Sequence, residues 1–238
     1  MTETRPASGV LPDRTALRHA ASVVVLRHDM PGGPAVLMGQ RGAGAAFMPS
    51  KYVFPGGAVD PQDAEVPLWQ PLPVATADAL ARHPCPGGTP PVTPEALAAA
   101  ALRELWEETG LILGHPGGWP GPIPDDWAGF AARGYRPDAQ GLRFVFRAIT
   151  PMGRPRRFDA RFFMVEATAL RGDPDDFSQA CDELSHLHWV PLDQARDLNL
   201  PFVTEVVLSE VTALCRGTSS PGVPFFDNTG PQSRFSRL

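Results

Sequence analysis

The chain has 238 residues, 43% of them hydrophobic and 20% charged, and its formal net charge at pH 7 is −5. That is enough chain for a sizeable core, in one elaborated domain or two small ones, and the acidic balance argues against a large nucleic-acid surface. No apolar run approaches the ~20 residues that span a bilayer, and the first residues lack a signal-peptide core, so we expect a cytoplasmic protein.

The first strands are predicted from β-branched runs and turn signals. Residues 1–17 are expected to form a flexible polar arm. The runs at 21–27 and 35–41 flank a Pro-Gly-Gly turn, which predicts a β-hairpin. After a loop, the stretch KYVFPGGAVD predicts a short strand that enters a turn at Gly56 and Gly57.

A Pro-rich stretch and the strongest helix signal follow. Residues 61–93 are expected to be a long surface insertion with at most a short helix at 74–82. Thr93 is a favourable N-cap, Pro94 suits the first helical position and Gly110 is a favourable C-terminal cap, so a helix is predicted between them. Its small and aliphatic residues form one stripe that can pack on a sheet.

The rest of the chain mixes strands and helices. The patterns predict, in order, a short helix at 125–134, strands at 142–150, 160–167 and 186–191, a short helix at 192–197 and a final helix at 201–215. We therefore expect a single layered domain over 18–216, of α/β or α+β type, followed by a loose tail at 217–238.

Three carboxylates crowd the end of the predicted long helix. Glu104, Glu107 and Glu108 share one edge of it, although negative charge is unfavourable near a helix C-terminus and like charges at this spacing repel. A solvated acidic face is the simplest interpretation. A bound Mg²⁺ or Mn²⁺ resolves the conflict better, because hard divalent cations take carboxylate oxygens as ligands.

These residues resemble the Nudix box, G-x5-E-x7-R-E-U-x-E-E-x-G-U, in which U is an aliphatic residue. Every specified position from Glu95 through Arg103 to Leu111 agrees with it, and Gly57 resembles its first glycine. Glu95 follows Gly57 by 38 positions instead of six, so 32 residues are inserted within the box.

The interruption is similar to one branch of the Nudix hydrolases, the branch that resembles the mammalian peroxisomal coenzyme A diphosphatase. The stretches AFMPSKYVFPGGAVD and RRFDARFF resemble segments of the same branch. The resemblance implies the Nudix fold, an α/β/α sandwich around a mixed β-sheet. It also implies metal-dependent hydrolysis of the diphosphate in a nucleoside diphosphate derivative.

The resemblance also implies roles for the motif residues. Glu104, Glu107 and Glu108 would hold the Mg²⁺ or Mn²⁺ ion, and Glu104 and Glu107 would take part in catalysis. Arg103 would orient a glutamate, with Glu95 as its other partner. The alternatives are a surface ion pair for Arg103 and a simple helix-end charge for Glu95.

Other residues are candidates for the remaining roles. Many enzymes of the family take a further acid from a loop beyond the sheet, and Glu183 is chosen over Asp175, Asp176 and Asp182 because it precedes the strand at 186–191. His186 and His188 on that strand are assigned no metal. Expected substrate-binding residues are Arg41, Lys51, Gly56, Gly57, Arg154, Arg156 and Arg157, for which a plain turn or a solvated basic surface is the alternative.

The best single expectation for the substrate is coenzyme A or an acyl-coenzyme A. The sequence leaves open ADP-ribose-type, NADH-type and oxidised-nucleotide substrates, and also a catalytically silent nucleotide-binding module. No nucleic-acid or membrane partner is expected, and both a monomer and a homodimer remain open.

Overall fold

The computed structural model describes residues 16–45, 48–83, 85 and 89–238. The predicted N-terminal arm therefore lies outside the described residues, apart from its last two positions. Thr93 accepts a hydrogen bond from the backbone N–H of Ala96 (3.1 Å), and Gly110 adopts the left-handed conformation with φ 74°. The caps that predicted the long helix are therefore confirmed.

The helices and strands follow the chain in this order. The strands are β1 Leu17–Arg27, β2 Ala35–Arg41, β3 Tyr52–Val53, β4 Gly56–Ala58, β5 Gly114–Pro116, β6 Tyr135–Pro137, β7 Arg143–Ile149, β8 Arg157–Glu166, β9 Leu184–Pro191, β10 Pro224–Asp227 and β11 Arg234–Arg237. The α-helices are α1 Val74–Arg82, α2 Pro94–Thr109, α3 Ala128–Ala132 and α4 Phe202–Cys215, and 3₁₀ turns include η1 Pro61–Glu65.

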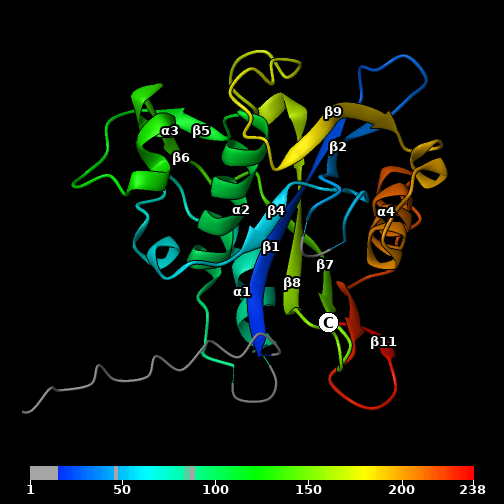
Figure 1. Ribbon diagram of the computed structural model, residues 1–238. Helices are drawn as coiled ribbons and strands as arrows, with labels where there is room; N and C mark the ends of the chain where they lie inside the picture. Colours follow the sequence, from blue (N-terminus) through cyan, green and yellow to red (C-terminus); the bar gives the residue numbers. More distant parts are fainter. Residues whose placement is uncertain (1–15, 46–47, 84, 86–88) are drawn as a thin grey trace, which may run out of the picture.

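A mixed sheet runs through the molecule (Figure 1). Its strand order is β11-β10-β7-β8-β1-β2-β3, with β4 also paired to β1 and β9 to β2. The central pair β1–β8 is parallel, whereas β1–β2 is the predicted antiparallel hairpin, with Leu26 opposite Val36. Strands β5 and β6 form a separate two-stranded ribbon.

Helices cover both faces of this sheet, which confirms the α/β/α sandwich (Figure 1). Helix α2 packs on the face that presents Val23 and Val25, and α4 packs on the opposite face, with Val24 and Leu26. The two clusters arise because alternate residues of β1 point to opposite faces. None of the helices in the described residues is long and apolar enough to cross a membrane.

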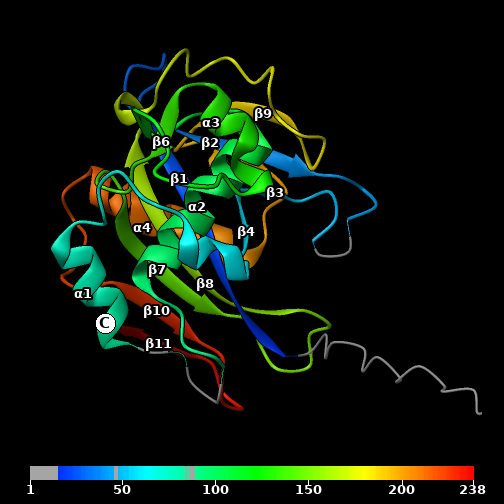
Figure 2. The same ribbon diagram turned by 90° about the vertical axis from the view of Figure 1, so that its left-hand side faces the viewer.

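Helix α2 is buried on nearly all sides, and the prediction of a single packed stripe was therefore wrong. All residues from Ala96 to Arg103 are buried, and so is Trp106 on the side away from the sheet. The segment predicted as a surface insertion supplies this cover, because its Val66, Leu72 and Leu80 join the core around α2. Figure 2 shows this segment and α3 on the outer side of the helix.

The prediction of a loose C-terminal tail was also wrong. Strand β10 pairs with β7, with Phe225 opposite Arg147, and β11 pairs with β10 to form the edge of the sheet. Asn228 donates to the carbonyl of Ile149 at 2.8 Å, which fixes the end of β10. Strands of four residues between Pro- and Gly-rich segments carry too few residues for a clear alternation pattern.

The contact between Arg237 and Glu210 can be tested as the anchor of this tail. Arg237 donates to both Glu210 oxygens, at 2.8 and 3.2 Å, and the Glu210 side chain is only 10% exposed. Replacing Arg237 by Ala should lower the free energy of unfolding by about 1–2 kcal/mol, because a nearly buried carboxylate loses its cation. The measurement is urea unfolding. Arg234→Ala, on the same exposed strand, should change the free energy of unfolding by less than ~0.5 kcal/mol. An equal decrease in both variants would contradict the role of Arg237 as the anchor of the tail.

Candidate active site

Arg103 is the buried centre of the predicted site. Its side chain is 5% exposed and lies among four carboxylates, of which Asp60 is the most distant at 3.7 Å. The guanidinium donates to Asp63 through Nε at 3.0 Å and Nη2 at 3.1 Å, to Glu104 at 2.8 Å and to Glu107 at 3.2 Å. Nη2 also donates to the carbonyl of Ala58 in β4 at 3.0 Å. One side chain thereby ties η1, α2 and β4 together.

Asp63 takes the place that was predicted for Glu95, and this corrects the sequence analysis. Glu95 is exposed in the first turn of α2, eight residues or about 12 Å along the helix from Arg103. The signal for Asp63 was present in the sequence, because it follows Gly57 by six positions, the spacing that the box gives to its first acid. The 32 extra residues therefore lie after Asp63, between it and Arg103.

The Gly-Gly turn lies against the carboxylates of α2. Gly56 and Gly57 pair with β1 opposite Ser22 and Ala21. The N–H of Gly56 donates to Glu108 Oε2 at 2.7 Å. A Cβ atom at Gly57 would overlap the Glu104 carboxylate, so only glycine permits this close approach.

Glu183 brings a further carboxylate close to Glu104 and Glu108 from a distant part of the chain. It precedes β9, and its Oε1 accepts a hydrogen bond from Arg41 Nη2 at 2.8 Å. Burial is the main cause of the raised pKa values of Glu104 and Glu108, and the charge of Glu183 adds to it, so Glu183 lies near both carboxylates. The loop before it is fixed to α2 by the N–H of Cys181, which donates to the carbonyl of Glu107 at 2.9 Å.

Burial makes this group of carboxylates electrostatically unfavourable by itself. It raises the pKa of Glu104 to about 7, that of Glu108 well above the ordinary value, and that of Glu107 to a smaller extent. Buried carboxylates around a glycine turn are the hard oxygen ligands that Mg²⁺ and Mn²⁺ accept. The donor chemistry of Glu104, Glu107 and Glu108 therefore fits a divalent cation, whereas their oxygens do not all lie within 4.8 Å of one another in the described structure.

Of the predicted basic residues, Arg41 pairs with Glu183 in this group, whereas the side chains of Lys51 and Arg157 are engaged or placed elsewhere. Lys51 donates to Asn199 Oδ1 at 2.5 Å and to the carbonyl of Leu200 at 3.1 Å, which attaches the loop before β3 to the segment that precedes α4. Arg154 and Arg156 lie in the turn before β8. Arg157 is opposite Leu17, five residues or roughly 17 Å along β1 from the position opposite Gly56.

A second cluster of ligand-type side chains has a structural explanation. Within the described chain, His19, Cys85 and Asp159 bring one possible ligand atom each within 4.8 Å of the others. However, both oxygens of the buried Asp159 accept from Arg147, at 2.8 and 2.7 Å, and Oδ2 also lies 3.2 Å from Arg161. Two guanidinium groups around one carboxylate oppose a further cation, so the cluster is an ion-pair network.

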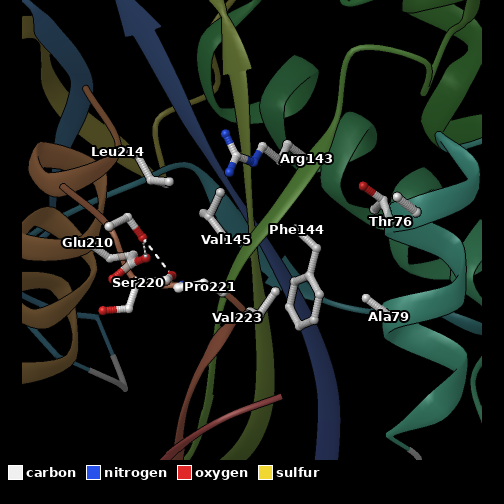
Figure 3. Close-up of a pocket in the computed structure, with 13 residues that line it drawn as sticks. Thr76, Ala79, Arg143, Phe144, Val145, Glu210, Leu214, Ser220, Pro221 and Val223 are labelled. Atoms are coloured by element: carbon white, nitrogen blue, oxygen red, sulfur yellow. Dashed lines mark hydrogen bonds between the residues drawn. The ribbon is translucent and has the colours of Figure 1, made fainter. Parts of the chain in front are cut away.

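A cavity of about 360 Å³ lies away from the carboxylates (Figure 3). It is bounded by α1, α4, the beginning of β7 and the segment 219–223, and residues such as Thr76, Phe144 and Leu214 line it. None of the predicted site residues lines this cavity. The candidate active site is therefore the open carboxylate group beside β4.

The pairing of Arg103 with Asp63 rather than with Glu95 can be tested directly. Asp63→Asn should lower the free energy of unfolding by about 2 kcal/mol, because the buried Arg103 loses one of its paired carboxylates. Glu95→Gln should change it by less than ~0.5 kcal/mol. Urea unfolding of both variants measures the free energy of unfolding. A larger decrease in Glu95→Gln than in Asp63→Asn would show that Glu95, and not Asp63, is the partner of Arg103.

The cation site gives a second test. Addition of MgCl₂ to about 100 times its Kd should raise Tm by ~5–10 °C over protein in EDTA, because an ion bound only by the folded state stabilises it by about 2.7 kcal/mol. Glu104→Gln/Glu108→Gln should lose this increase, whereas Glu95→Gln should keep it. Thermal scans with and without MgCl₂ provide the measurement, and an unchanged increase in the double variant would exclude these ligands.

Comparisons with known proteins show which proteins this chain is similar to. No family model matches the chain. It is 30% identical over 230 residues to the acyl-coenzyme A diphosphatase NUDT19 of Gallus gallus, covering 72% of this chain and 60% of that protein. It is 28% identical over 167 residues to the putative nudix hydrolase 7 of Caenorhabditis elegans, covering 65% and 46%. The chain thus spans about half to three fifths of the length of these curated relatives.

A solved structure covers more of the fold. The crystal structure of a NUDIX hydrolase from Alicyclobacillus acidocaldarius matches with a TM-score of 0.63 and 29% identity, over 87% of this chain and 99% of that one. The box residues, the sandwich around the mixed sheet and these relatives agree, and the chain belongs to the Nudix hydrolase superfamily.

Proposed function

We propose that this protein is a metal-dependent hydrolase that cleaves the diphosphate bond of a nucleoside diphosphate derivative, with coenzyme A or an acyl-coenzyme A as its substrate. The observation that carries the proposal is the group of buried carboxylates around Arg103. Burial and the charges of neighbouring glutamates raise the pKa values of Glu104 and Glu108, as expected of a site that is completed by a cation.

Each residue of the group has a distinct part in the proposed reaction. A bound divalent cation would neutralise charge on the diphosphate and lower the pKa of an attacking water. Glu104, Glu107 and Glu108 would hold it, and the N–H of Gly56 fixes the orientation of Glu108. Arg103 keeps Glu104 and Glu107 in place through its hydrogen bonds, since each would otherwise rotate away from the other acids.

Glu183 is the proposed proton acceptor or additional ligand. It is half exposed, so water reaches it, and Arg41 Nη2 donates to its Oε1 at 2.8 Å, which holds the carboxylate in place. A general base needs to be within reach of the attacking water, and Glu183 lies beside the acids that would hold the metal. Arg41 thus orients an acid and is less available for the phosphates than the sequence suggested.

The coenzyme A preference is supported by the relative from Gallus gallus, which is named an acyl-coenzyme A diphosphatase. Cleavage of this substrate gives 3′,5′-ADP and a phosphopantetheine or acyl-phosphopantetheine. ADP-ribose, NADH and oxidised nucleotides are the alternative substrates. A silent nucleotide-binding module is the alternative from another class. It is disfavoured because Glu104, Glu107 and Glu108 are all present and clustered.

A substrate panel with one variant tests the proposal. Wild type should hydrolyse coenzyme A or its acyl esters faster than ADP-ribose, NADH or oxidised dNTPs, and only with Mg²⁺ or Mn²⁺. Glu108→Gln should lower turnover at least ~100-fold, because a metal ligand is lost. The fold should persist, since the amide oxygen of Gln can still accept from Gly56. Chromatography of the products is the measurement, and near-normal turnover in Glu108→Gln would refute the mechanism.

A further inference from the structure

Strained backbone gathers at one corner of the proposed site. Among the described residues, the non-glycine residues with positive φ are Met48 (51°), Ser50 (58°) and His186 (52°). All three lie near the end of β2. Ser50 N–H donates to the carbonyl of Arg41 at 3.1 Å, and Ser185, the neighbour of His186, donates through Oγ to the carbonyl of Gln40 at 3.1 Å. Such conformations cost free energy and cluster at functional sites.

A β-bulge explains why His186 adopts this conformation. Met38 pairs with His188 and Gln40 with Ser185, so His186 and Leu187 together oppose Gly39. A Cβ atom on Gly39 would lie 2.9 Å from both Leu184 and Leu187, which shows that leucine side chains fill the space beside this glycine. With Leu187 turned inward, the bulge leaves His186 exposed three residues after Glu183.

The ring of His186 is oriented rather than loose. Its Nδ1 lies 3.1 Å from Ser185 Oγ. Since the Ser185 hydroxyl gives its own proton to Gln40, Nδ1 carries the hydrogen of this contact. Among the described residues the other nitrogen, Nε2, makes no hydrogen bond, and in the imidazolium form it donates to an anionic oxygen. The neighbouring cations are already engaged, Arg41 by Glu183 and Lys51 by Asn199.

We propose that His186 binds the substrate, donating a hydrogen bond from Nε2 to a phosphoryl oxygen of the diphosphate. This assignment rests on the proposed function: the bulge leaves an exposed imidazole three residues after Glu183, beside the end of β2, where Arg41 and Lys51 already have partners. No metal was predicted for the histidines of this strand, and the proposed role of His186 involves none.

Two substitutions separate binding from backbone strain. His186→Asn keeps a residue that tolerates positive φ and removes the imidazole, and His186→Gly removes the strain as well. Both should raise KM for coenzyme A about 10-fold, with kcat changed less than ~3-fold. The Tm of His186→Gly should equal or exceed that of wild type. His188→Asn, an exposed histidine on the same strand, should leave KM unchanged.

Calorimetric titration with ADP, with and without Mg²⁺, gives the second measurement. Both His186 variants should bind ADP about 10-fold more weakly than wild type. If wild type hydrolyses coenzyme A or binds ADP while His186→Asn has an unchanged KM and Kd, the assignment of His186 is overturned and the proposed function stands. If wild type neither hydrolyses any diphosphate in the panel nor binds ADP, both proposals fail together.

Discussion

The structure depends on one buried cation, the guanidinium of Arg103. A charge buried to this extent is tolerated only with paired carboxylates and good hydrogen bonds. Asp63, Glu104 and Glu107 provide them from η1 and α2, and the carbonyl of Ala58 adds a contact to β4. The register between the helix and the glycine turn is therefore fixed by electrostatics as well as by packing, and the Glu104 carboxylate is held against Gly57.

The same pairing creates the need for a further cation. Five carboxylates, those of Asp63, Glu104, Glu107, Glu108 and Glu183, are arranged around the guanidinium groups of Arg103 and Arg41. Arg103 satisfies Asp63 and orients its neighbours on the helix, but Glu108 accepts a hydrogen bond from the N–H of Gly56 and has no paired guanidinium in the described structure. Carboxylates thus outnumber their guanidinium partners beside the glycine turn, which favours a divalent ion and a diphosphate bound through it.

Features governed by local chemistry could be predicted from the sequence. The Thr93 and Gly110 caps gave the bounds of α2, and β-branched runs gave the β1–β2 hairpin. Features that depend on distant contacts could not. The first acid of the box should follow Gly57 by six positions, which gives Asp63, and should precede Arg103 by eight, which gives Glu95. Only the folded chain shows that Asp63 is the partner of Arg103. The burial of α2 and the pairing of β10 with β7 likewise arise from segments far apart in sequence.

The position of the insertion explains why the box tolerates 32 additional residues. The chain departs after Asp63 has paired with Arg103 and returns at Thr93, where α2 begins, so neither the glycine turn nor the carboxylates need to move. Between these points its apolar residues cover α2, and Arg147 donates to the carbonyl of His83. Arg161, which lies in the RRFDARFF stretch, belongs to the same buried network through Asp159 and His19. The insertion is therefore anchored at both ends and adds to the core, and this offsets the modest entropy of closing a longer loop.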